Sequence, residues 1–86
     1  MPKYKSHNII YALRIGEAGD RRLHIHATGT SGTKVYIVDE YLNIITTERD
    51  TMSKYESKRA DDILEDEQDI MLKQWEKELN TFRKSI

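Results

Sequence analysis

Two histidines separated by one residue, His24 and His26, are the side chains of this chain best suited to chemistry. They lie in residues 21–28, where apolar and polar residues alternate with the period of a β-strand. Both imidazoles therefore project from the same side, about 6.6 Å apart along the backbone. Because imidazole titrates near neutral pH, such a pair can bind an anion, exchange a proton or ligate a metal. The spacing indicates a strand with one histidine-bearing face.

The chain on either side supplies neighbours for this pair. A loop at residues 29–32 contains two glycines, and residues 33–38 alternate again, which predicts a β-hairpin. If the faces match across the turn, Lys34 and Tyr36 lie beside the histidines, and a strand at residues 8–15 adds Arg14. The sequence therefore predicts a partner-binding face made of Arg14, Arg22, His24, His26, Lys34 and Tyr36.

The elements around this face predict a single α+β domain over residues 1–86. Residues 1–8 are polar, which favours a flexible arm. Residues 9–47 predict an antiparallel meander of three or four strands, the fourth at 41–47, with one apolar face. Residues 53–84 predict two helices that cover that face.

The helical region has recognisable starts and one apolar stripe. Ser53 and Glu56 fit a capping box, and Asp66 is suited to cap a second helix. The apolar side of the first helix is Tyr55, Ala60, Ile63 and Leu64, and the stripe of the second is Leu72, Trp75, Leu79, Phe82 and Ile86. One long helix over 53–84, or a coiled-coil use of the stripe, remains open.

Composition limits the classes of function. The chain of 86 residues has no cysteine, no apolar run long enough to span a membrane and no signal peptide, so we expect a cytoplasmic protein without membrane contact. The net charge is −1, with residues 1–47 mildly basic and residues 48–86 acidic. Such a division along the sequence is too slight to steer nucleic acid strongly.

Three segments taken together resemble a small bacterial family described as a domain of unknown function. They are HIHATGTSGTKVYI at 24–37, SKYE at 53–56 and ILEDEQDIMLKQWEKEL at 63–79. The family pairs a His-x-His strand with a Lys-containing strand and ends in a helix that bears a tryptophan. The resemblance implies a place in a two-gene module of the toxin–antitoxin kind, although Leu23 stands where the family usually has proline.

Three functions follow as hypotheses. The favoured one is a bacterial or phage-type interaction protein that binds a protein partner or RNA through the basic face, without a cofactor. The alternative is a metal-independent ribonuclease in which His24 and His26 are catalytic and transfer the protons. The lesser alternative is a His-x-His metal site, for which the sequence nominates no third ligand. The sequence leaves open whether the chain forms a homodimer and whether it is the toxic or the neutralising member.

Overall fold

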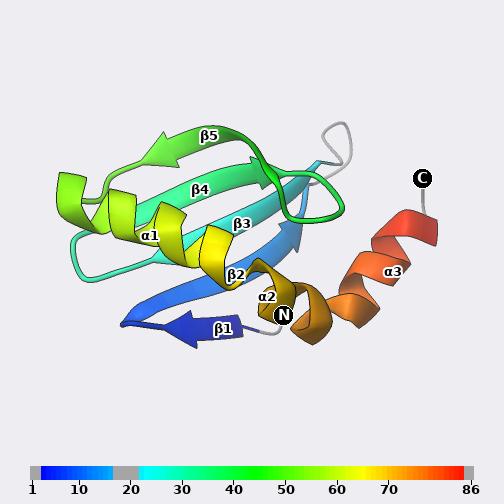
Figure 1. The fold of residues 1–86 in the computed structure, drawn as a ribbon. Helices are drawn as coiled ribbons and strands as arrows, with labels where there is room; N and C mark the ends of the chain where they lie inside the picture. Colours follow the sequence, from blue (N-terminus) through cyan, green and yellow to red (C-terminus); the bar gives the residue numbers. More distant parts are fainter. Residues whose placement is uncertain (1–2, 17–21, 85–86) are drawn as a thin grey trace.

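The computed structural model describes residues 3–16 and 22–84 and shows one antiparallel sheet with helices on one side (Figure 1). The five strands follow one another across the sheet in chain order. The elements are β1 (Lys3–Ser6), β2 (Ile9–Ile15), β3 (Leu23–Thr28), β4 (Thr33–Val38), β5 (Ile44–Asp50), α1 (Lys54–Asp66), α2 (Gln68–Gln74) and α3 (Glu76–Lys84). The predicted α+β meander is confirmed in outline, with five strands and three helices in the described residues.

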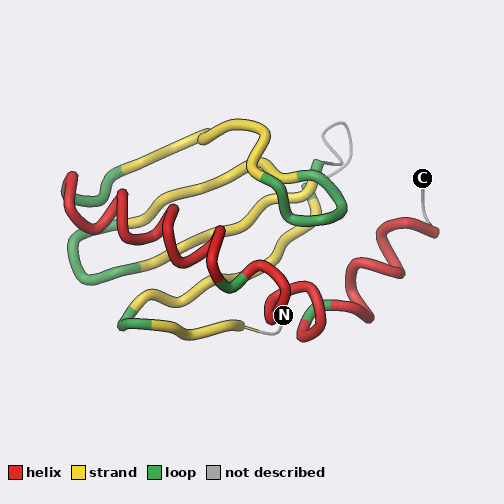
Figure 2. Tube along the Cα trace, viewed as in Figure 1, coloured by secondary structure: helices red, strands yellow, loops and turns green. Residues whose placement is uncertain are grey.

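The three helices pack on the same face of the sheet. α1 crosses over the strands, and the chain then continues through α2 to α3 beside one end of the sheet (Figure 2). One buried cluster joins the helices to alternate strand residues: Ile9, Tyr11, Leu13, Leu23, Ile25, Ala27, Tyr36, Val38, Leu42, Ala60, Ile63, Leu64, Met71, Trp75, Leu79 and Phe82. Burial of this apolar surface is the main force that holds the two layers together.

The other side of the sheet carries none of the three helices, and we call it the open face. Strand register and alternation place thirteen residues there: Lys3, Lys5, Ile10, Ala12, Arg14, His24, His26, Thr28, Thr33, Val35, Ile37, Thr46 and Arg49. Most of them are polar or basic. The sheet therefore has one apolar face beneath helices and one face of different chemistry.

Residues 3–6 form an edge strand, so the prediction of a flexible arm over residues 1–8 is wrong for this part. A tight turn at His7 and Asn8, with φ values of 51° and 66°, folds β1 back onto β2. Alternating lysines on a short edge strand protect it from pairing with other chains. The polarity of this segment thus reflects its edge position in the sheet.

β1 also contacts the helical layer through Glu67, at the junction of α1 and α2. The hydroxyls of Tyr4 and Ser6 both donate hydrogen bonds to the Glu67 carboxylate, at 2.8 Å for Ser6. The hydrogen bond to Glu67, together with burial, raises the pKa of Tyr4 to about 12. The two bonds join the first strand to the middle of the helical region.

The strand predicted at residues 41–47 starts later than expected, because the chain turns first. Leu42 has a φ of 66° while its side chain is buried in the core. The Asp39 carboxylate closes the turn by accepting hydrogen bonds from the N–H groups of Tyr41 (2.8 Å) and Asn43 (2.9 Å). Burial acts to raise the pKa of Asp39, but these bonds outweigh it and hold the pKa below its usual value.

The start of α1 confirms half of the predicted capping box. Ser53 Oγ accepts the Glu56 N–H at 3.2 Å, as an N-cap should. The Glu56 carboxylate instead accepts from the N–H groups of Ser31 (2.9 Å) and Thr30 (3.0 Å) in the β3–β4 loop. Bonds from Ser31 and Thr30 lower the pKa of Glu56. A Cβ at Gly29 would lie 2.3 Å from this carboxylate, so a larger residue there would displace the Glu56 side chain from the loop.

The helical region divides at Glu67 and again at Trp75. The prediction of two helices and the alternative of one long helix over 53–84 are therefore both wrong. We expected Asp66 to cap the second helix. The N-cap of α2 is instead Glu67, and its side chain makes no hydrogen bond to the backbone there. Tyr55, predicted on the buried side of the first helix, is 75% exposed. Each division redirects the chain (Figure 1).

The predicted apolar stripe is confirmed in its centre. Trp75, Leu79 and Phe82 are buried, Leu72 packs partly against the core, and Met71 is completely buried beside them. Ile86 and most of the β2–β3 connection, residues 17–21, lie outside the described residues. In the part of the chain that the structure describes, no helix is long and apolar enough to cross a bilayer.

Candidate functional site

The strand register brings together one part of the predicted binding face. His24 pairs with Arg14 on β2, and His26 pairs with Val35 on β4. All four side chains therefore lie on the open face, away from the helices. The prediction that both imidazoles point away from the apolar core is confirmed.

Lys34 and Tyr36 are not part of this face, which corrects the sequence-based prediction. Lys34 pairs with Ala27 and Tyr36 pairs with Ile25, so both point toward the helices. The loop between β3 and β4 has four residues, and this even number pairs even-numbered residues of one strand with odd-numbered residues of the other. The faces therefore match in the opposite sense from the one expected.

Beneath α1, these two residues form a polar network. Lys34 Nζ lies 2.6 Å from Asp61 Oδ1 and 2.9 Å from Ser57 Oγ, and the Tyr36 hydroxyl donates to the same Asp61 oxygen at 2.6 Å. Burial, and then the hydrogen bond to Asp61, raise the pKa of Tyr36 far above its usual value. Because every polar group here has a partner, the network fastens α1 to β4.

His24 is held on the open face by both ring nitrogens. Its Nδ1 lies 2.9 Å from the Arg22 carbonyl oxygen, and its Nε2 lies 3.0 Å from Glu48 Oε2. Both neighbours are acceptors, so both hydrogen bonds form only when the ring carries two protons. His24 is 9% exposed, and the contact joins β3 to β5 across β4.

Glu48 and Arg49 reach the site because β5 is irregular. Arg49 pairs with Val35, whereas Thr47 pairs with Tyr36, so Glu48 is an extra residue in a β-bulge. At a bulge, an extra side chain can point to the face of the sheet that regular alternation would not allow it to reach. Neither residue was predicted to lie here, because a bulge leaves no signature in ITTERD.

His26 is half-buried between charged neighbours. With His24, Arg14, Val35, Glu48 and Arg49, it lines a hollow of about 240 Å³. Burial lowers the pKa of His26, and the positive charges of Arg14, His24 and Arg49 lower it further, while Glu48 opposes them. At neutral pH, the ring is therefore neutral, and it lies beside the guanidinium groups of Arg14 and Arg49 and the carboxylate of Glu48.

Arg22 immediately precedes β3 and is exposed. Its carbonyl oxygen is the acceptor for His24 Nδ1. Its backbone therefore orients a predicted site residue.

The catalytic and metal hypotheses stay predictions, and the geometry adds one observation on each. His24 has both nitrogens engaged, so it has none free to exchange a proton with a substrate. Within residues 3–16 and 22–84, no three His, Asp or Glu residues are grouped as metal ligands. What the open face can do is present positive charge to an anion.

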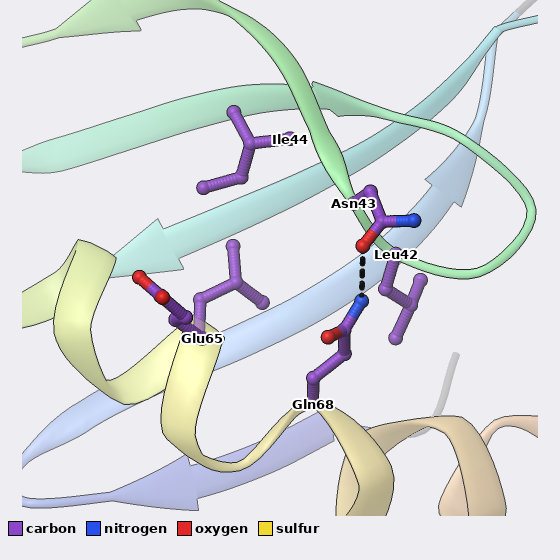
Figure 3. A pocket seen from close by; sticks show the side chains of 6 residues that line it. Leu42, Asn43, Ile44, Glu65 and Gln68 are labelled. Atoms are coloured by element: carbon purple, nitrogen blue, oxygen red, sulfur yellow. Dashed lines mark hydrogen bonds between the residues drawn. The ribbon is translucent and has the colours of Figure 1, made fainter.

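A separate hollow, of about 390 Å³, lies on the helical side between the β4–β5 loop and the junction of α1 and α2 (Figure 3). Leu42 and Leu64 are buried beneath it. Gln68 Nε2 donates to Asn43 Oδ1 at 2.8 Å and to the Tyr41 carbonyl at 2.7 Å. These bonds join α2 to the loop, and Glu65 is the one ionisable group in the lining. The open face therefore remains the better candidate site.

Comparisons with protein families, curated proteins and solved structures found no match to this chain, so the family resemblance inferred from its motifs stays a prediction.

Proposed function

We propose that this protein binds nucleic acid through the open face, by contacts with phosphates and without preference for sequence. The observation that carries the proposal is the register of the sheet, which gathers basic side chains from β1, β2 and β5 on a face that none of the helices covers. A place in a two-gene module stays a prediction.

The charge of this face supports an anionic partner. Lys3, Lys5, Arg14 and Arg49 face one carboxylate among the described residues, that of Glu48, and its Oε2 already lies 3.0 Å from His24 Nε2. The division of charge along the sequence was too weak to favour nucleic acid, but the fold concentrates the cations on one side. Local concentration of charge, more than net charge, strengthens the attraction of phosphates.

The apolar content of the face favours nucleic acid over an acidic protein. Val35 and Ile37 are 5% and 3% exposed, and among the thirteen residues that the register places on this face, Ile10, at 37%, is the large apolar side chain that is exposed. Protein interfaces usually have an apolar centre, whereas nucleic-acid interfaces are more polar and more positive. Hydroxyls of Thr28, Thr33 and Thr46 add donors of the kind that phosphates accept.

The position of the aromatic residues supports contacts to the backbone of the nucleic acid. Tyr4, Tyr11 and Tyr36 lie on the helical side of the sheet. Stacking of bases on aromatic rings, the common source of affinity for single strands, therefore has no platform among the described strand residues. Phosphate contacts alone do not distinguish sequences.

The test is the affinity of the chain for labelled oligonucleotides, measured by fluorescence anisotropy at low and high salt. Arg14→Glu combined with Arg49→Glu should weaken binding by at least about tenfold and reduce its dependence on salt. The matched control, Lys73→Glu with Lys77→Glu, makes the same change of charge on exposed helical positions. Equal effects of the two pairs, or no effect of the first, would contradict the proposal. Circular dichroism establishes that each variant is folded.

A further inference from the structure

The register arranges the open face in rows that run across the strands. The middle row is continuous through all five strands: Lys3, Ala12, His26, Val35 and Arg49 are successive partners. Since adjacent strands lie about 4.8 Å apart, this row is about 19 Å long. It has a cation at each end, a histidine in its centre, and two short apolar side chains between them.

Two adjacent hollows lie along this row. One, of about 420 Å³, is lined by Lys3, Ala12, Arg14 and Ile15. The other, of about 240 Å³, is lined by His24, His26, Val35, Glu48 and Arg49 and shares Arg14 and Ile15 with the first. In this second hollow the Glu48 carboxylate lies 3.0 Å from His24 Nε2. Ala12 lines the first hollow and Val35 the second, and these two residues are two strands, or about 10 Å, apart.

We propose that the middle row is the track along which one nucleic-acid strand crosses the sheet, with a phosphate in each hollow. Arg14 stands between the hollows and contacts both phosphates, Lys3 contacts the first, and Arg49 and His26 contact the second. Short side chains at positions 12 and 35 allow the sugar-phosphate backbone to approach the sheet closely. This inference rests on the proposed function and specifies the line along which the nucleic-acid strand crosses the sheet.

The rows on either side are less suited to an anion. The row Lys5, Ile10, Thr28 and Thr33 has one cation and an exposed isoleucine. In the row Arg14, His24, Ile37 and Thr46, the imidazole is already bound to Glu48. Only the middle row combines cations at both ends with space above the sheet.

Two matched pairs of variants test the track. Lys3 and Lys5 lie on the same strand and the same face, but only Lys3 belongs to the middle row. Lys3→Gln should weaken the binding of an oligothymidylate of about twelve nucleotides by about threefold or more and lower its salt slope by about one, whereas Lys5→Gln should change the affinity less than about twofold. Likewise, Ala12→Phe should fill the first hollow and weaken binding, whereas Ile10→Phe should not.

Each other result has a distinct meaning. If Lys3→Gln and Lys5→Gln weaken binding equally, or Ala12→Phe has no effect, the track is wrong while general binding by the open face stands. If reversal of charge at Arg14 and Arg49 also leaves the affinity unchanged, the proposed function fails with it. If poly-glutamate competes as strongly as an oligonucleotide of equal charge, the partner is an acidic protein and not a nucleic acid. Thermal unfolding of each variant establishes that the sheet is intact.

Discussion

The two faces of the sheet use similar residues for different purposes. On the covered face, Lys34 is 5% exposed, and its charge is paired with Asp61 beneath α1. On the open face, Arg14 and Arg49 are not enclosed by a helix and adjoin a hollow. A basic residue on a strand therefore indicates a binding surface only when the register places it on the side without helices.

The largest effect is expected at the core of the covered face. Trp75 is completely buried, so Trp75→Ala should lower the free energy of unfolding by about 3 to 5 kcal/mol, because it leaves a large cavity. Urea denaturation followed by circular dichroism measures this loss. Trp75→Phe is the control, since the indole Nε1 has no hydrogen-bond partner here and most of the volume is kept. A loss below about 1 kcal/mol for alanine would mean that the helices contribute little to the core.

An intermediate loss of stability is expected when a buried lysine, but not an exposed one, is replaced. Lys34→Met removes hydrogen bonds from a charged group to Asp61 and Ser57 and should cost about 2 kcal/mol. Lys58→Met removes an exposed pair with Asp62 and should cost less than about 0.5 kcal/mol. Chemical denaturation measures both. Oligonucleotide affinity should be unchanged in folded Lys34→Met, and a tenfold loss would place Lys34 in the binding face after all.

The smallest effect, on pH dependence, concerns His26. Its pKa in the free protein is lowered by burial and by Arg14, His24 and Arg49, against the opposing effect of Glu48. A bound phosphate favours the protonated ring, so affinity should rise severalfold as the pH falls below about 6.5. The stability of the free protein should fall over the same range, because the unfolded chain binds the proton more readily.

Anisotropy and denaturation at pH 7.5 and 5.5 measure the two trends. His26→Gln should abolish the rise in affinity and the part of the stability loss that comes from this ring. If the variant keeps the full increase in affinity at low pH, the ring does not contact the anion.

Much of the fold could be predicted from alternation and composition, because each apolar stripe needs a cover. The strands at β2, β3 and β4, the Ser53 cap and the burial of Trp75 follow from local patterns. The edge strand β1 was missed because polarity on an edge resembles polarity in an arm. The divisions at Glu67 and Trp75 were missed because neither position carries a helix breaker.

The site was predicted only in part, for a reason that lies in β4. Its residues KVYIV are apolar on both faces, so alternation alone did not decide whether Lys34 and Tyr36 or Val35 and Ile37 lie beside the histidines. The number of loop residues in the hairpin decides it. The approach of Glu48 to His24 depends on a bulge, which is a property of the paired strands and not of either sequence alone.

The irregular β5 has one further consequence. It is the outer strand on its side of the sheet, and its side chains are exposed throughout. A flat strand in that position would be a template for the growth of intermolecular β-structure, but bulges distort the spacing that an incoming strand must match. The departure that places Glu48 beside His24 thus also gives the molecule a measure of protection from aggregation along this edge.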